Sequence, residues 1–209
     1  MSVLLPTYPA PQSAEPYFLD AGGVQRSIAG GEDMRLDRLG DRWGLSVTLI
    51  PMRWHDLSTA EQTRAARVWV SRLTQGLSQG AIMNWPQPGF KPGGGTLEVS
   101  GAGVGSGASQ VSVNHGGAAE LIPEGQFFTH IRAATGRRYL YQVRADTILG
   151  ANAATVVPLW PRIRGPMSPL DVLEFSKPTI EGLVQGDKVG WSLAVSRLSG
   201  ISFTLQERA

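Results

Sequence analysis

The chain of 209 residues contains no cysteine and only three histidines. Without cysteine it forms no disulfide and no thiolate metal site. His55, His115 and His130 stand apart in the sequence and lack the paired spacing of metal ligands. The sequence therefore predicts neither a metal site nor a bound cofactor.

Long apolar runs are missing as well. None approaches the roughly 18 residues that a membrane-spanning helix needs. Residues 1–19 contain no basic residue and several prolines, which is unlike a signal peptide or a transit peptide. We therefore expect a soluble protein that is made in the cytoplasm and does not contact membranes.

Charge of one sign is not in excess. The formal net charge is +2, and the 19 basic residues form no long cluster. Only Lys91, Lys177 and Lys188 among these basic residues are lysines. This pattern predicts no sequence-specific binding to nucleic acid.

Glycine and proline, by contrast, are plentiful, with 26 and 14 residues. Together with period-two alternation of apolar residues, they favour a mainly β fold (α+β) that resembles a barrel or sandwich. Alternation predicts a strand over residues 43–52. It also predicts a closing hairpin of residues 189–196 and 201–206 around a turn at Ser199-Gly200, with Trp191 in the core.

The sequence predicts one α-helix, over about residues 58–75. Ser58 and Glu61 match the S-x-x-E capping box, in which each side chain bonds a free backbone N–H at the other position. Apolar residues at helical spacing follow, and Trp69 is expected to pack the helix on a sheet. Two glycines are candidate ends of the helix: Gly76 and Gly80.

Residues 1–30 are predicted to form an extended arm, and residues 31–209 a single β-rich domain. Prolines in the arm oppose a regular helix or a central strand. Its apolar side chains either fold back on their own body or lie on a neighbouring subunit, and the sequence leaves both open. Two short strands around a Gly-rich tip predict a protruding hairpin at about residues 89–117, which we expect to gain order from neighbouring subunits together with the arm.

Motifs for catalysis are weak or missing. Residues 103–108 match the permissive dinucleotide pattern G-x-G-x-x-A, but no helical periodicity follows, so a hairpin tip is favoured. Asp33, Asp37 and Asp41 lack the dense order of a calcium loop. There is no G-K-[ST] and no G-x-S-x-G. We therefore predict that the chain is not an enzyme, although a Ser/His/Asp triad assembled in space leaves no sequence pattern.

Several aromatic residues stand next to prolines or loop residues, among them Trp54. Three interpretations stay open for them: anchors for a partner, peripheral core, and platforms that stack on a sugar. The arm and the hairpin contribute further apolar candidates. The predicted interface residues are Tyr8, Tyr17, Phe18, Leu19, Trp85, Phe90, Leu97, Val99 and Trp160.

The order of the elements forms a larger pattern over about residues 40–209. An R-W pair at Arg42 opens an alternating strand, a capped helix follows, and a short strand runs into Pro86. After the Gly-rich hairpin come a P-x-x-P-x-x-R connector (Pro158 to Arg164) and a strand pair that ends near Glu207. This order resembles the distal tail proteins of long-tailed, siphovirus-type bacteriophages.

The resemblance implies a β-barrel-like belt domain with one helix and an extended hairpin, and a hexameric ring around the tail channel. The chain would then be a structural virion protein of the phage tail, assembled in the host cytoplasm. Its expected partners are further copies of itself, the tail tube protein, the hub proteins of the tail tip or baseplate, and the tape measure protein. Two other classes stay open: a β-sandwich module that binds a receptor carbohydrate, and a hydrolase of cell-wall material.

Overall fold

The computed structural model describes residues 2–27, 30–36, 38–53, 60–89, 91–186, 190, 192–193, 197–199 and 201–208. Among these residues the fold is mainly β with a single helix, as the sequence predicted. The chain divides into two compact units. The sheet unit comprises Met1–Tyr17, Trp43–Pro86 and Thr179–Arg208, and the barrel unit comprises Phe18–Arg42 and Gln87–Pro178.

This division differs from the predicted arm of residues 1–30 and single domain of residues 31–209. The chain leaves the sheet unit after Pro86, builds the barrel and returns at Thr179. The predicted arm is not one element, because β1 (Val3–Leu4) and β2 (Pro11–Leu19) belong to the main sheet. Pro11 and Pro16 lie in β2, which is an edge strand of the sheet, the position in which proline is tolerated.

The sheet unit is built on six strands in the order β1-β7-β16-β19-β5-β2. β1 runs parallel to β7, whereas β7, β16, β19 and β5 pair antiparallel. The strand predicted over residues 43–52 is confirmed as β5, which ends at Leu49. The strands not yet given bounds are β5 (Arg42–Leu49), β7 (Ala81–Asn84), β16 (Thr179–Val184) and β19 (Ser202–Glu207).

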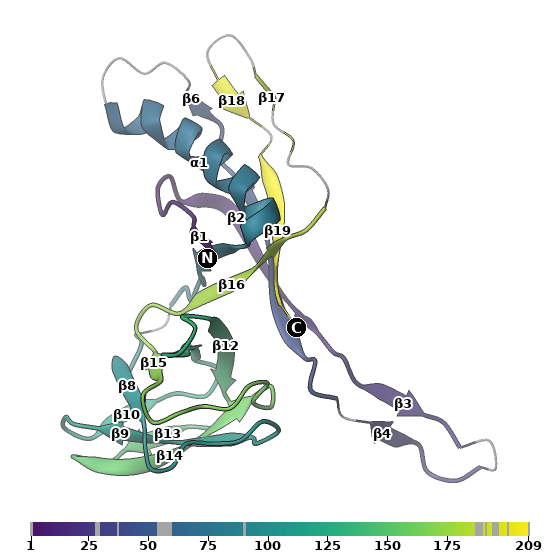
Figure 1. The fold of residues 1–209 in the computed structure, drawn as a ribbon, viewed down its shortest axis with the longest axis vertical. Helices are drawn as coiled ribbons and strands as arrows, with labels where there is room; N and C mark the ends of the chain where they lie inside the picture. Colours follow the sequence, from purple (N-terminus) through teal and green to yellow (C-terminus); the bar gives the residue numbers. More distant parts are fainter. Residues whose placement is uncertain are drawn as a thin grey trace. The chain divides into compact units, whose positions relative to one another are not determined.

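The helix α1 (Ala60–Gln79) packs on this sheet, which confirms the predicted helix and extends its end (Figure 1). Trp69 is fully buried, and its ring lies 6.1 Å from that of Phe203 on β19. Gly80 ends the helix with φ +90° and donates its N–H to the Gly76 carbonyl oxygen. The predicted capping box of Ser58 and Glu61 lies outside the described residues and side chains.

The alternation predicted at the end of the chain is confirmed in β19, but its pairing was wrong. Phe203 and Leu205 are buried, while Ser202 is exposed. Instead of closing a hairpin with residues 189–196, β19 lies between β16 and β5. In this central position the apolar face of β19 is covered by α1, with Phe203 against Trp69. β17 (Ser192–Leu193) pairs with β18 (Arg197–Ser199), and β18 with β6 (Met52–Arg53); Trp191 lies outside the described residues.

The barrel unit contains a closed six-stranded barrel in the order β11-β12-β14-β9-β8-β15 (Figure 1). Its interior holds a continuous apolar cluster that includes stacked Phe128 and Phe175, with ring centroids 4.5 Å apart. A two-stranded sheet, β10 (Glu120–Ile122) with β13 (Thr147–Leu149), adds Ile122 and Leu149 to the same core. The barrel strands are β8 (Thr96–Val99), β9 (Gln110–His115), β11 (Phe127–Ile131), β12 (Arg138–Val143), β14 (Ala153–Trp160) and β15 (Val172–Glu174).

The hairpin predicted to protrude at residues 89–117 is instead part of this barrel. Its strands are β8 and β9, and Leu97 and Val99 point into the core with 4% and 2% exposure. The Gly-rich tip is also held, because Gly107 donates its N–H to the Ile163 carbonyl oxygen at 2.7 Å. The alternation therefore marked the inner face of a closed barrel rather than a surface for a partner.

Candidate functional site

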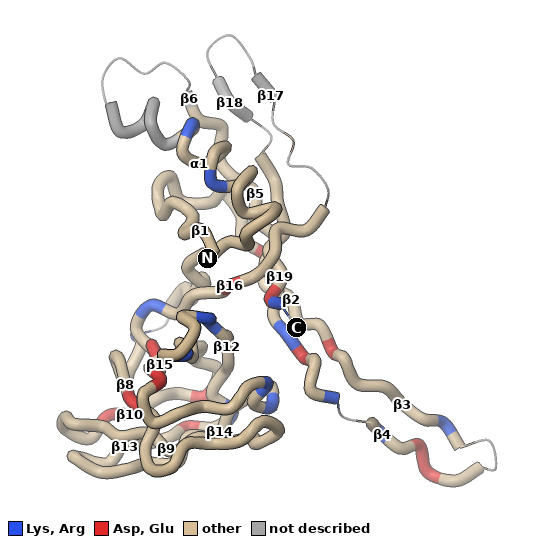
Figure 2. The backbone as a smooth tube through the Cα atoms, viewed as in Figure 1, with Lys and Arg blue, Asp and Glu red and all other residues tan. Residues whose placement is uncertain are grey.

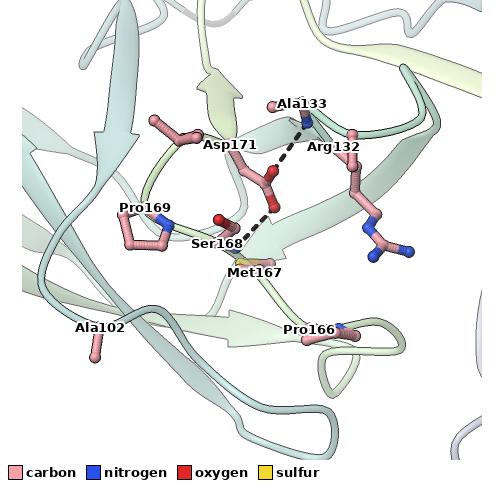
Figure 3. A pocket seen from close by; sticks show the side chains of 10 residues that line it. Ala102, Arg132, Ala133, Pro166, Met167, Ser168, Pro169 and Asp171 are labelled. Atoms are coloured by element: carbon pink, nitrogen blue, oxygen red, sulfur yellow. Dashed lines mark hydrogen bonds between the residues drawn. The ribbon is translucent and has the colours of Figure 1, made fainter.

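The barrel carries an open pocket of about 520 Å³ (Figure 3). Most of its lining is apolar, and Arg132 and Ser168 supply polar side chains. Asp171 lies between the backbone of Ala133 and that of Ser168. The remaining lining residues are Ala102, Ala134, Pro166, Met167, Pro169 and Leu170. None of these described lining residues is aromatic, so they offer no platform for sugar stacking.

Asp171 holds three chain segments together at this pocket. One carboxylate oxygen accepts the Ala133 N–H at 2.9 Å, and the other accepts the Ser168 N–H at 2.8 Å and His130 Nε2 at 2.7 Å. Because a carboxylate only accepts, the imidazole carries its proton on Nε2. His130 is fully buried and Asp171 is 2% exposed. The cluster thus joins β11, the turn after it and the loop before β15.

The protonation of this pair follows from its surroundings. Burial lowers the pKa of His130, and this outweighs the opposite effect of Asp171; the charges of Arg132 and Arg164 lower it further. Burial acts to raise the pKa of Asp171, but the hydrogen bonds from Ser168, His130 and Ala133 outweigh it, so this pKa is lowered. A neutral imidazole beside a carboxylate is the favoured state near neutral pH.

This geometry differs from that of a catalytic dyad. The carboxylate accepts hydrogen bonds from three donors of the barrel unit, and the second imidazole nitrogen, Nδ1, is buried without a hydrogen-bond partner among the described residues. A general base needs a nitrogen that reaches a nucleophile or a water. The pair is therefore a structural clasp. This pair was not predicted from the sequence, because His130 and Asp171 are 41 positions apart and share no motif.

The other sites weighed from sequence have these outcomes. In the described part of the chain, no group of three or more His, Asp or Glu side chains could hold a metal ion. No helix follows residues 103–108, which lie between β8 and β9, so the dinucleotide pattern lacks its required context. His115 ends β9, with Nδ1 3.4 Å from the Gly150 carbonyl oxygen. His55 and Trp54 lie outside the described residues.

β3 (Gly23–Gln25) and β4 (Met34–Leu36) form a two-stranded antiparallel ribbon in the barrel unit, which we call the ribbon (Figure 1). All six of its strand residues are exposed. Met34 is 62% exposed, Leu36 40% and Val24 60%. An ion pair of 2.8 Å joins Arg35 to Asp20, and acidic and basic residues alternate along this region without a basic stripe (Figure 2). The ribbon thus exposes three large apolar side chains beside its charged residues.

The sheet unit has an apolar groove of about 280 Å³ where β2 begins and β7 ends. Trp85 is buried in its floor, and its ring makes an edge-on contact with Trp43 at 5.9 Å. The rim carries Thr7 and Asn84, both exposed. The other lining residues are Pro6, Pro11, Ala14, Met83 and Pro86. None of these described lining residues is charged.

A second, polar groove of about 280 Å³ lies along β2, β5 and β19. Hydroxyl pairs cross the two inner strands: Ser46 with Thr204 at 3.2 Å, and Thr48 with Ser202 at 3.3 Å. Since their neighbours in the alternation pack beneath α1, these hydroxyls lie on the opposite face of the sheet. Among the described residues of the lining, Glu15 is charged and none is Lys or Arg.

Three of the predicted interface residues are buried in their own unit. Trp85 is 4% exposed, and Leu97 and Val99 belong to the barrel core. The prediction is corrected for these three, because a loop-like or Gly-rich context did not reveal that their side chains point inward. Trp85 still reaches the apolar groove from beneath.

The others keep part of their surface. Tyr8 is 54% exposed. Tyr17 covers Gly44, where an added Cβ would lie 2.1 Å from the Tyr17 ring. Phe18 and Trp160 are half-buried against each other, with ring centroids 5.7 Å apart. The last two are Leu19, which is half-buried, and Phe90, which lies outside the described residues.

No protein-family model matches the chain, and no curated protein matches it. Within the described residues, no helix combines the length and apolar character required to cross a membrane.

Proposed function

We propose that the chain is a ring-forming structural subunit of a bacteriophage tail, of the distal tail type, which joins the tail tube to the tail tip and surrounds the channel. The observation that carries this proposal is the ribbon β3–β4. It exposes Met34 and Leu36 on an isolated two-stranded hairpin, which is marginally stable at best without a further layer. In an assembly, the neighbouring subunit would supply that layer.

The polar face of the sheet supports the same function. A channel wall that lets DNA pass needs side chains that do not hold phosphates, and Lys or Arg would do so. The groove along β5 and β19 offers hydroxyls and Glu15 instead. The element order that resembles distal tail proteins is the other support.

The proposed role is structural and not enzymatic. The buried His130–Asp171 pair joins segments of the barrel unit through hydrogen bonds, and the described residues hold no candidate metal centre. The expected partners are copies of the chain and the adjoining tube, tip and tape measure proteins, and the expected location is the virion.

The decisive experiment measures the mass and shape of the purified chain. Native mass spectrometry is expected to give six times the chain mass of 22.4 kDa, and negative-stain images are expected to show closed rings. A species that stays monomeric up to high concentration would contradict the proposal. If that monomer also bound purified cell-surface glycans, a carbohydrate-binding module would be the better function.

A further inference from the structure

The two faces of the ribbon differ in chemistry. The register pairs Gly23 with Leu36 and Gln25 with Met34, so the side chains of Gln25, Met34 and Leu36 share one face. Val24 and Arg35 pair on the other face, where Arg35 makes its ion pair with Asp20. One face of the ribbon is therefore uncharged, with two large apolar side chains, while the other is charged.

The apolar groove of the sheet unit matches the uncharged face. Its volume of about 280 Å³ lies just below the usual range for small-molecule sites, and it is suited to one or two apolar side chains. Its lining is uncharged, so docking Met34 and Leu36 would remove no charge from water on either side. The amide of Asn84 and the hydroxyl of Thr7 at the rim can bond the open backbone edges of the ribbon.

We propose that the uncharged face of the ribbon in one copy of this chain docks in the apolar groove of a second copy, through Met34 and Leu36. This inference rests on the proposed function, because it names the contact that closes the ring. Ribbon and groove are different surfaces, so the contact is head to tail. Head-to-tail contacts form rings where the rotation between copies closes.

A second copy is the occupant because every chain carries one ribbon and one groove. In a closed ring each ribbon finds a groove and none of either is left over. A foreign protein that covered the ribbon would leave the groove exposed in every copy.

The test uses the absence of cysteine from the chain, which gives a clean background for crosslinking. Ala14 lines the groove, so a double variant carries Met34→Cys and Ala14→Cys. Under mild oxidation it is expected to give a ladder of covalent oligomers on a denaturing gel. A mixture of the two single variants is expected to give covalent dimers. The matched control, Val24→Cys with Ala14→Cys, places the thiol on the opposite face of the same strand pair and is expected to give at least tenfold less product.

A second pair of variants tests the contact without a crosslink. Met34→Asp puts a charge on the docking face and is expected to weaken assembly at least tenfold in sedimentation. Val24→Asp puts the same charge on the other face, opposite Arg35, and is expected to assemble like the unmodified chain. Circular dichroism shows whether each variant is folded, so a loss of assembly in a folded chain is attributable to the face.

The outcomes separate this inference from the proposed function. Closed rings that show no crosslink between positions 34 and 14 would overturn the docking contact and leave the ring function standing. A crosslink that forms only within one chain would also overturn it, since the groove would then hold its own ribbon. Crosslinked open chains without rings would support the contact and contradict the ring.

Discussion

Two of the antiparallel hairpins, β8–β9 and the ribbon β3–β4, both carry apolar residues in alternation but differ in how much of these side chains is buried. In β8–β9, Leu97 and Val99 are almost completely buried, and their neighbours across the pair complete a closed barrel. In the ribbon β3–β4, Met34 and Leu36 keep 62% and 40% of their surface in water. Alternation therefore states that a strand has an apolar face. Whether the same chain covers that face depends on the other strands that surround it.

Among the substitutions that compare the barrel with the ribbon, the largest loss of stability is expected in the barrel core. Phe128→Ala removes a fully buried ring stacked on Phe175 and should lower the free energy of unfolding by about 3–5 kcal/mol. Chemical denaturation followed by fluorescence measures this. An effect below about 1 kcal/mol would mean that the barrel interior is not closely packed.

The glycines of the β8–β9 tip allow a matched comparison. Gly101 and Gly103 both have positive φ, +73° and +85°. An added Cβ meets nothing at Gly101, but at Gly103 it would lie 2.3 Å from the Met167 carbonyl oxygen. Gly101→Ala should cost about 1–2 kcal/mol for the left-handed backbone, and Gly103→Ala about 1–3 kcal/mol more for overpacking. Equal thermal shifts for the two variants would show that the tip is not held against the segment of Met167.

Acid should weaken the barrel through the His130–Asp171 clasp. The pKa of His130 is lowered in the folded chain, so the native state prefers the neutral imidazole. The stability it contributes is present above its unfolded pKa of about 6.5 and is lost as the pH falls below that value. Asp171, whose pKa is also lowered, adds a further loss below about 4.

The measurement is the free energy of unfolding of the barrel at pH 7.5 and pH 5. His130→Gln keeps a hydrogen-bond donor for Asp171 but cannot be protonated in this range. It should reduce the difference between the two pH values. An unchanged difference in the variant would assign the acid sensitivity to other groups.

The smallest effect is expected in the ribbon of the monomer. Leu36→Ala removes a side chain that has little cover, so it should change the stability of the isolated chain by no more than about 0.5 kcal/mol. Thermal unfolding of dilute, monomeric protein measures this. A shift as large as that of Phe128→Ala would mean that the ribbon is covered within its own chain.

Part of the fold could be read from local residue patterns. The helix around Trp69 and the strands β5 and β19 were predictable, because periodicity of apolar residues reports directly which side of an element is buried. Pairing was less predictable. β19 carried a clear alternation, yet its partners are β16 and β5, far away in the sequence, and alternation does not name a partner.

The candidate surfaces show the same limit. The exposure of Tyr8 agrees with its proline-rich surroundings, but Trp85 has a similar local sequence and is buried against Trp43. No local signal distinguishes Tyr8 from Trp85, because the burial of each ring depends on whether residues distant in the sequence pack against it. The His130–Asp171 clasp was missed for this reason.

By itself, the sequence determined the mainly β character, the predicted helix and the lack of thiol chemistry. Composition and the spacing of apolar residues are local properties, so they can be read without knowing which distant segments pack together. Only the tertiary structure decided that β8 and β9 close a barrel, that Asp171 meets His130, and that Met34 and Leu36 stay uncovered. These outcomes depend on contacts between residues far apart in sequence. The free energy of burying a side chain there depends on whether other parts of the chain have surfaces that pack closely against it.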